Sequence, residues 1–273
     1  MPEAFFVPDG DWYSATELTR GPWDPEAQHA GPPAALIARE IEGVPADGSR
    51  IVGRLTYEIL RPVPIRRLRV EAAVARPGRS VELVEASLRD EQEELVRARA
   101  WRLRPAELDL RGELEWEDEG SAAVLRRAEA PPPPAAAEPF NVAFFPTRQS
   151  IGYHTAMEYR FVAGAFGRPG PATAWLRMRH PLVTGEEPTP LQRVAIAADS
   201  GNGISGPLDF ERFVFINIDL SIHLGRAPVG EWIGLDSTTI PDRSGLGITD
   251  TALYDEAGAL GRAAQTLLVA PRS

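Results

Sequence analysis

A single carboxylate ends a helical stretch that is apolar almost all round, TPLQRVAIAADSGNG, residues 189–203. Asp199 lies on the same helical stripe as Leu191 and Ala195, so its side chain shares their buried side. A buried carboxylate needs hydrogen-bonding or charged partners, and such groups gather at functional sites. Asp199 is therefore a candidate general base or water anchor. The alternative is that it caps a nearby loop or pairs with an arginine.

One amide stands out in the last predicted strand, residues 261–269. By alternation Gln265 shares a face with Gly261, Ala263 and Leu267, and it is the only polar side chain on that face. A polar group that faces a core must find partners there. Gln265 either bonds the backbone or faces Asp199 across a small polar pocket.

The helix that carries Asp199 has clear predicted ends. Thr189 is an N-cap, Pro190 takes the first helical position, and Gln192 completes a capping box. Gly201 and Gly203 supply the left-handed termination that glycine adopts at low cost. These signals predict a single helix over 189–203.

A second helix is predicted over 29–43, HAGPPAALIAREIEG, between a Gly-Pro start and a final glycine. It follows an extended lead-in, residues 1–28, that carries aromatic anchors. Alternating apolar residues between turn signals predict the strands. The expected strands cover 51–60, 67–75, 80–90 and 95–103 after this helix, and 153–163 and 172–180 before the helix of Asp199.

The strand around Asn217 has an aliphatic face formed by Val214, Ile216, Ile218 and Leu220. Asn217 lies on the opposite face in a strictly alternating strand. The pattern alone therefore predicts that Asn217 is exposed.

The second half of the chain repeats the order of the first, one helix followed by four strands. The tetrapeptide LRDE at Leu88 returns as LYDE at Leu253, a shift of 165, and RS at Arg79 returns at Arg243, a shift of 164. A series in nearly constant register indicates two copies of one unit. A long helix followed by antiparallel strands is buried only if the strands wrap around it, so we predict an α+β fold with two wrapped helices. The expected units are a first copy over 1–116, a Pro/Ala-rich linker over 117–140 and a second copy over 141–273.

The composition excludes several classes of function. The 273 residues contain no cysteine, and all 29 basic residues are arginine. Disulfides, thiolate nucleophiles, Schiff-base lysines and phosphate-loop lysines are therefore impossible. A net charge of −10 argues against nucleic acid as a partner. The sequence shows no signal peptide and no apolar run long enough for a membrane span, so we expect a cytoplasmic protein without a membrane partner.

Other catalytic patterns fit poorly. A serine nucleophile elbow requires Gly-x-Ser-x-Gly, and the segment GISG that begins at Gly203 has the wrong spacing. Arginine pairs such as Arg97 with Arg99 are expected mainly on solvated strand faces. Four histidines lack the spacing of metal ligands, so we expect structural roles and no metal for His29, His154, His180 and His223.

Several segments together resemble the tandem-hotdog acyl-CoA thioesterases, the group that includes acyl-CoA thioesterase II. They are HAGPPAALIARE in the first half, and WLRMRHP, LQRVAIAAD, FINIDLSIHLGRAP and GALGRAAQTLLV in the second. Their order is similar to the family's order, and the resemblance covers nearly the whole chain. It implies two tandem hotdog folds, each an antiparallel sheet wrapped around a central helix, and hydrolysis of acyl-CoA without a cofactor.

The resemblance implies that Asp, Gln and Ser/Thr side chains bind and activate water for attack on a thioester. Asp199 and Gln265 fall on the family's aspartate and glutamine, and Asn217 falls where the family has a hydroxyl. An asparagine can still orient a water molecule. The hydroxyls that could substitute are those of Ser221, Ser237 and Thr238.

Thioester hydrolysis also needs hydrogen-bond donors where negative charge develops on the carbonyl oxygen. The start of the first helix offers free N–H groups and a positive dipole end. Pro32 and Pro33 have no N–H, so Gly31 and Ala34 are the candidate substrate-binding donors. The alternative is that Gly31 serves only as an N-cap.

The sequence thus predicts one composite site, with the acyl carbonyl held at the first helix and water held by Asp199 and Gln265. The position equivalent to Gln265 in the first half is Ala100 or Trp101, which predicts one site per chain. A hotdog hydratase would carry a histidine five residues after the aspartate, where Ile204 stands. The alternative function is a non-catalytic acyl or acyl-CoA binding protein with the same fold. Tandem hotdogs expose sheet edges that pair between chains, so a homodimer or higher homo-oligomer is expected.

Overall fold

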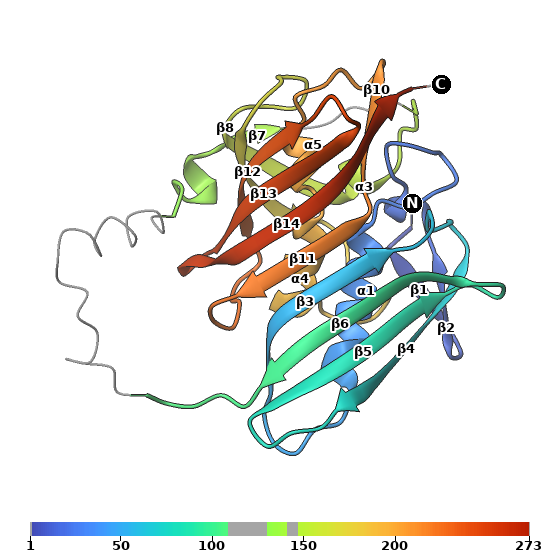
Figure 1. Cartoon of the computed structure of the whole chain (residues 1–273), viewed down its shortest axis with the longest axis vertical. Coiled ribbons are helices and arrows are strands. Elements are labelled where there is room, and N and C mark those ends of the chain that lie inside the picture. The colour runs from blue at the N-terminus through green and yellow to red at the C-terminus, as the bar shows by residue number, and fades with distance from the viewer. Residues whose placement is uncertain (1, 109–129, 141–146, 273) are drawn as a thin grey trace.

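The computed structural model describes residues 2–108, 130–140 and 147–272. Two copies of a helix-and-sheet unit follow one another along the chain (Figure 1). The first copy consists of α1 (Gly31–Gly43), β3 (Ile51–Ile59), β4 (Arg67–Arg76), β5 (Val81–Arg89) and β6 (Glu94–Leu103). The second consists of α4 (Pro190–Ala198), α5 (Gly201–Ile204), β10 (Phe213–Asn217), β11 (Asp219–Leu224), β12 (Ile233–Pro241), β13 (Leu246–Asp255) and β14 (Gly258–Pro271).

Shorter elements precede each helix. Before α1 lie β1 (Phe6–Asp9), β2 (Trp12–Ala15) and the 3-10 turn η1 (Glu17–Thr19). Before α4 lie η2 (Pro134–Ala136), β7 (Glu138–Phe140), α3 (Tyr153–Ala156), β8 (Met157–Ala163) and β9 (Ala172–Met178). No helix in the described part of the chain is long and apolar enough to cross a membrane.

In the described ranges the strands form one sheet of fourteen strands. Its order is β1-β2-β4-β5-β6-β3-β11-β14-β13-β12-β9-β8-β7, and β10 also pairs with β14. The two copies join where β3 pairs with β11 in antiparallel register, with Tyr57 opposite Leu220. Figure 1 shows the sheet in front and the helices α1 and α4 behind it.

The helices α1 and α4 pack against each other in opposite directions. Gly31 at the start of α1 lies against Ile196 near the end of α4. At the other end of the pair, Thr189 donates to Glu42 at 2.7 Å. Each end of the helix pair therefore combines the start of one helix with the end of the other.

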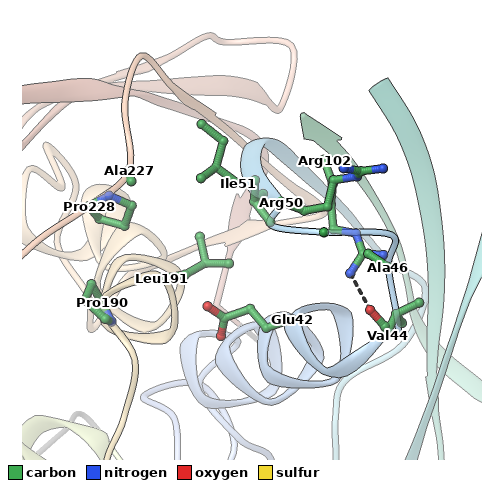
Figure 2. A pocket seen from close by; sticks show the side chains of 12 residues that line it. Glu42, Val44, Ala46, Arg50, Ile51, Arg102, Pro190, Leu191, Ala227 and Pro228 are labelled. Carbon is green, nitrogen blue, oxygen red and sulfur yellow. Dashed lines mark hydrogen bonds between the residues drawn. The ribbon is translucent and has the colours of Figure 1, made fainter. Parts of the chain in front are cut away.

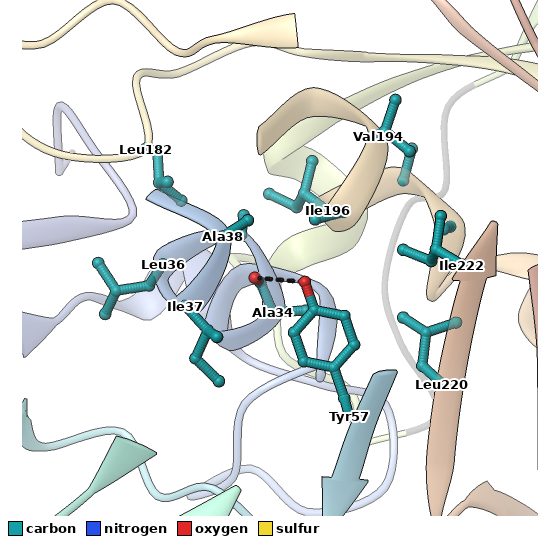
Figure 3. Close-up of a cluster of buried hydrophobic side chains, with 14 of the residues drawn as sticks. Ala34, Leu36, Ile37, Ala38, Tyr57, Leu182, Val194, Ile196, Leu220 and Ile222 are labelled. Atoms are coloured by element: carbon teal, nitrogen blue, oxygen red, sulfur yellow. Dashed lines mark hydrogen bonds between the residues drawn. The ribbon is translucent and has the colours of Figure 1, made fainter. Parts of the chain in front are cut away.

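An apolar core fills the space between this helix pair and the sheet. Figure 3 shows Ile37 and Tyr57 of the first copy together with Ile196 and Ile222 of the second. The Tyr57 hydroxyl donates to the Ala34 carbonyl at 3.1 Å, which satisfies the polar end of a buried ring. One core serves both copies, and the predicted α+β fold of two antiparallel units with central helices is confirmed.

Strand register supports the predicted 165-residue shift between the copies. Three cross-strand neighbours on β4, β5 and β6 have direct counterparts on β12, β13 and β14. In the first copy these neighbours are apolar, namely Val74, Val84 and Ala100. In the second copy the corresponding residues are polar, namely Thr239, Thr249 and Gln265.

The single helix predicted over 189–203 is wrong, because the structure divides it into α4 and α5. The break falls at Asp199 and Ser200, and neither Gly201 nor Gly203 has a positive φ. A Cβ on Gly201 would lie 2.6 Å from the Thr251 hydroxyl oxygen. This glycine therefore permits a close approach to the sheet and does not terminate a helix.

Two further segments differ from the expected elements. The strand predicted over 153–163 begins with one helical turn, α3, before β8. Within the expected linker, residues 117–129 lie outside the described residues, while β7 pairs with β8 and Pro132 accepts a hydrogen bond from the Trp175 indole at 2.7 Å. Residues 130–140 thus pack against the second copy.

Candidate active site

The candidate site lies at the end of α4, where Asp199 caps the helix. Its carboxylate is 2 % exposed and contacts side chains from three other parts of the chain. The Asn217 amide donates to Oδ1 at 2.8 Å, and the Gln265 amide donates to the same oxygen at 3.3 Å. Nδ1 of His29 lies 2.8 Å from Oδ2. These three partners surround the carboxylate at the break between α4 and α5.

His29 comes from the loop just before α1, and two contacts fix it. Its backbone N–H donates to the Thr19 carbonyl at 2.8 Å, and its ring stacks on Tyr153 with centroids 3.8 Å apart. Burial raises the pKa of Tyr153 well above its ordinary value, so the phenol stays protonated and donates to the Ile196 carbonyl at 2.8 Å. The imidazole is thereby held against a rigid surface.

The Nδ1 atom of His29 lies close to two groups that it cannot serve at once. Besides Asp199, the backbone N–H of Gly31 approaches it at 3.2 Å in the geometry of a donor. An ionised carboxylate only accepts hydrogen bonds, so Nδ1 carries the proton and donates to Asp199. When Nδ1 donates to the carboxylate, as the shorter, charge-assisted contact favours, the Gly31 N–H is released for another acceptor.

Gly31 is also fixed by sterics. A Cβ at this position would lie 2.5 Å from the Ile196 carbonyl oxygen, closer than real Cβ contacts allow. Only glycine lets the start of α1 approach the end of α4 so closely. The Ala34 N–H, in contrast, donates to the Ala30 carbonyl at 3.0 Å within the helix. Ala34 is therefore no free backbone donor, and Gly31 is left as the donor at this end of α1.

Gln265 connects the sheet to both short helices. Its amide nitrogen donates to Asp199 at the backbone oxygen (3.2 Å) as well as at Oδ1, and its amide oxygen accepts from the Asn202 N–H at 3.2 Å. Gln265 is 2 % exposed and every polar atom of its side chain has a partner. The amide thus holds the junction between α4 and α5 in place.

The structure buries Asn217 to 8 % exposure, so the exposure predicted from alternation is wrong. The reason is a β-bulge between β10 and β11, where one extra residue stands opposite β14. Phe215 and Asn217 face inward before the bulge, Leu220 and Ile222 face inward after it, and Ile218 between them is 49 % exposed. The first copy has the same irregularity between Val52 and Arg54.

The hydroxyls proposed as substitutes for Asn217 lie elsewhere. Ser237 is fully buried, but its hydroxyl pairs with that of Thr251 at 2.9 Å. Thr238 is exposed on the other face of β12, and Ser221 lies on β11 opposite Ala264. Among these candidates Asn217 is the residue that contacts the carboxylate.

The hydrogen bonds of Asp199 do not use all the acceptor positions of its carboxylate. A carboxylate offers about four lone-pair positions, two on each oxygen. Asn217 and Gln265 use Oδ1, and His29 uses one position of Oδ2. One acceptor position is therefore left on Oδ2, and the Gly31 N–H approaches the same His29 Nδ1 atom that contacts this oxygen. The His29 side chain, which contacts Oδ2, is 13 % exposed, whereas that of Asp199 is 2 % exposed.

Two models of known protein domains match the chain. The model of the acyl-CoA thioesterase C-terminal domain matches residues 126–269, and that of the N-terminal domain matches residues 19–103. The chain belongs to the acyl-CoA thioesterase family. It is a tandem-hotdog thioesterase of the thioesterase II-like type, and it catalyses thioester hydrolysis. The family resemblance and the enzyme class predicted from the sequence are both confirmed.

Solved structures show the same fold over the whole length of this thioesterase. A protein provisionally described as a thioesterase II from Thermobifida fusca superposes with a TM-score of 0.71 at 17% identity, covering 97% of this chain and 95% of its own. A hot dog protein of unknown function from Alicyclobacillus acidocaldarius gives 0.69 at 14% identity, covering 98% and 96%. An acyl-CoA thioesterase II from Mycobacterium marinum gives 0.61 at 16% identity, covering 97% and 94%. No functionally curated protein matches the sequence of this thioesterase.

Sequence reasoning missed two members of the site. His29 was expected to be structural, although it contacts the carboxylate, and Tyr153 was placed in a strand. The available signal was the position of His29 two residues before Gly31, which was itself a candidate substrate donor. The arginine pair Arg97 and Arg99 forms exposed ion pairs with Glu94 and Glu85.

Proposed function

We propose that this thioesterase hydrolyses acyl-CoA with a water molecule activated by Asp199. One arrangement carries the proposal: Oδ2 of a buried carboxylate contacts His29 and keeps a further acceptor position, and the Gly31 N–H approaches the same His29 nitrogen. The carboxylate serves as the general base, and the Gly31 N–H with the positive end of α1 serves as the oxyanion donor.

The reaction needs the bound water, the substrate, Asp199 and the Gly31 N–H. Water bound to Oδ2 gives a proton to Asp199 as its oxygen attacks the thioester carbonyl carbon. The carbonyl oxygen gains negative charge and accepts from Gly31. The intermediate then expels the CoA thiolate, which takes the proton from Asp199. The products are the free acid and CoA, and Asp199 returns to its ionised form.

The other residues position the base. His29 donates to Oδ2 and fixes its orientation, while Asn217 and Gln265 hold Oδ1. Gln265 acts here through Asp199 and the α4–α5 junction, because its amide nitrogen is fully engaged by Asp199. This assignment modifies the expectation that Gln265 grips the water directly.

The test compares Asp199→Asn with Asp250→Asn on a panel of acyl-CoAs, with release of free thiol as the readout. Asparagine keeps the shape but cannot accept the proton, so kcat should fall about 10³-fold, within the range of general-base catalysis. Asp250 forms an exposed ion pair with Arg262, and its variant should keep full activity.

Thermal unfolding establishes that both variants are folded. Full activity of Asp199→Asn would refute the mechanism. Tight binding of acyl-CoA without any turnover by the native chain would instead favour the non-catalytic binding protein.

Three expectations from the sequence stay predictions: the cytoplasmic location, a role in fatty acid metabolism, and a homodimer or higher homo-oligomer. Light scattering coupled to size-exclusion chromatography measures the oligomeric state directly. A monomeric mass would contradict the predicted oligomer.

A further inference from the structure

A cavity of about 440 Å³ lies at the other end of the helix pair, between the two copies. Figure 2 shows Glu42 and Leu191 on its helical side, Arg50 and Arg102 on its sheet side, and Pro228 of the second copy at its rim. Its size falls in the range of pockets that hold small organic ligands. The cavity does not include Asp199 or its partners.

The internal repeat makes this cavity the counterpart of the active site. Glu42 follows Pro33 by the same nine residues that separate Asp199 from Pro190. Val52 lines the cavity and precedes the bulge of the first copy, as Asn217 precedes the bulge of the second. Val52 and Ala100 thus replace Asn217 and Gln265, so the two sheet amides that hold Asp199 have no counterparts around Glu42.

The sheet side of the cavity carries an uncompensated positive charge. Nη2 of Arg102 lies 2.8 Å from Oε1 of Glu82, and Nε of Arg50 lies 3.3 Å from the same oxygen. The side chains of Arg50 and Arg102 are 5% and 3% exposed. Two buried guanidinium groups therefore share one carboxylate. Burying an unpaired charge is costly, so a site of this kind favours an anion that supplies the missing charge.

Hydrogen bonding leaves these arginines with unused donors. Nη1 of Arg102 donates to the carbonyls of Ile41 and Val44, at 3.0 and 2.8 Å. The Nε atoms of both arginines and Nη2 of Arg102 are buried without a well-aligned hydrogen bond. Guanidinium groups bind carboxylate and phosphate oxygens well because their donors are planar and fixed.

The helical side limits the choice of ligand. Glu42 accepts from the Thr189 hydroxyl at 2.7 Å and from the Gln192 amide at 3.2 Å, so its carboxylate is already bound to side chains at the start of α4. In the described residues no ion pair joins Glu42 to Arg50 or Arg102. A second negative charge on a ligand would therefore be repelled by the Glu42 carboxylate, which lines the same cavity.

We propose that this cavity is a second, non-catalytic binding site for an organic anion with one charged end. A carboxylate or phosphate meets Arg50 and Arg102, and an apolar body lies along Ile51, Val52 and Leu191. A free acid has this chemistry through its carboxylate, and an organic phosphate with a single phosphate group has it through that group; CoA shares the phosphate chemistry and serves as a probe for it. The site does not depend on the role proposed for Asp199.

Isothermal titration calorimetry on the full chain tests the proposal with octanoate, with the dicarboxylate suberate, with CoA and with inorganic phosphate. Arg50→Met leaves a balanced Glu82–Arg102 pair and should weaken anion binding at least tenfold without loss of stability. Ala227→Trp, on an exposed loop at the cavity, should weaken it similarly by filling the site. Suberate should bind less tightly than octanoate because of Glu42.

The matched control is Arg99→Met. Arg99 is exposed on β6 and forms an ion pair with Glu85 of β5. Anion binding by this variant should equal that of the native chain. Octanoate binding would identify a carboxylate site, and binding of CoA or phosphate in its place would identify a phosphate site; both support the proposal. It is overturned if no probe binds, or if the affinity and the stoichiometry of binding are the same in the native chain, Arg50→Met and Ala227→Trp, which would leave only binding at the active site.

Discussion

At the scale of single residues, the charge of Asp199 depends on donors that surround it almost completely. Its shortest amide contact, 2.8 Å, is to Asn217, and its contact to His29 is equally short. Each charge-assisted bond offsets part of the cost of burying the carboxylate. The site is therefore sensitive to small changes in these neighbours, even though they do not contact the reacting carbon.

Substitutions of Asn217 test this dependence. We expect Asn217→Val, which copies the equivalent Val52, to lower kcat/KM about 10- to 100-fold, since a hydrogen bond to a charged group contributes about 1.5–3 kcal/mol. Asn217→Thr restores one donor and should keep activity within about tenfold of the native value. Steady-state kinetics with an acyl-CoA measures both, and Ser221→Ala on β11 is the control. Native activity in Asn217→Val would show that this amide does not position the base.

Asp199 and Gln265 could be predicted as candidate site residues from the sequence, because each is a polar residue in an otherwise apolar pattern. Strict alternation did not predict the burial of Asn217, because one bulged residue at Ile218 reverses which side chains face inward. His29 was assigned a structural role because the residue pairs with a carboxylate that is 170 positions away in the chain. Contacts of that range follow from topology, which local patterns do not contain.

At the scale of elements, the site exists because two antiparallel helices approach each other unusually closely. Gly31 faces the Ile196 carbonyl where any side chain would collide, and its N–H lies 3.2 Å from the His29 nitrogen that contacts Asp199. The helix bounds were predicted well for α1, since Pro and Gly mark them, but the close approach was not. A glycine at a helix start allows another element to approach closely, but the sequence does not show which element that is.

Alanine substitutions separate this contact from the general effect of glycine in a helix. Gly31→Ala places a Cβ 2.5 Å from a carbonyl oxygen, so the helices must separate. We expect a loss of about 1–3 kcal/mol in the free energy of unfolding, as for other overpacked sites, together with loss of activity. Urea denaturation and kinetics provide the readouts.

Gly43→Ala is the matched control at the other end of α1, where no atom lies within 4 Å of the added Cβ. It should leave stability unchanged or raise it by about 0.4–1 kcal/mol, because alanine restricts the unfolded chain. Equal behaviour of the two variants would mean that the α1–α4 contact does not limit packing.

At the scale of the whole molecule, the two copies share a backbone plan but differ in what they bury. The turn aspartates Asp90 and Asp255 stand 165 residues apart and both have pKa values below the ordinary range. At Asp90 the backbone N–H groups of Glu93 and Gln92 dominate this lowering. The repeat was recognisable from sequence through these turns, since turn chemistry constrains residue types more than strands do.

Asp255 provides a test of stability against pH. Burial alone would raise the pKa of Asp255, but hydrogen bonds from Arg226 (2.6 Å), Val229 N–H (2.9 Å) and Ala257 N–H (2.8 Å) lower it overall. A folded pKa below the unfolded value means that the stabilisation is complete above about pH 5 and is lost as pH falls through the folded pKa. Asp255→Asn should lower the free energy of unfolding by about 1–3 kcal/mol at pH 7.

Urea denaturation from pH 7 to pH 2 measures this effect. The native chain should lose stability more steeply than Asp255→Asn below about pH 5, because the variant has no carboxylate to protonate there. Asp250→Asn, which breaks an exposed ion pair, should change stability by no more than about 1 kcal/mol. Parallel curves for the native chain and Asp255→Asn would contradict the role given to Asp255.

The pairing of β3 with β11 has a thermodynamic consequence for the molecule as a whole. The ladder continues into the Ile59 N–H, which donates to the Ile218 carbonyl at 2.9 Å, so the seam reaches the bulge beside Asn217. Proteins built from separable domains commonly melt in steps, whereas a shared sheet and core couple the halves. We expect a single calorimetric transition whose measured enthalpy equals its van't Hoff enthalpy, so that neither copy persists as a folded intermediate once the other has melted.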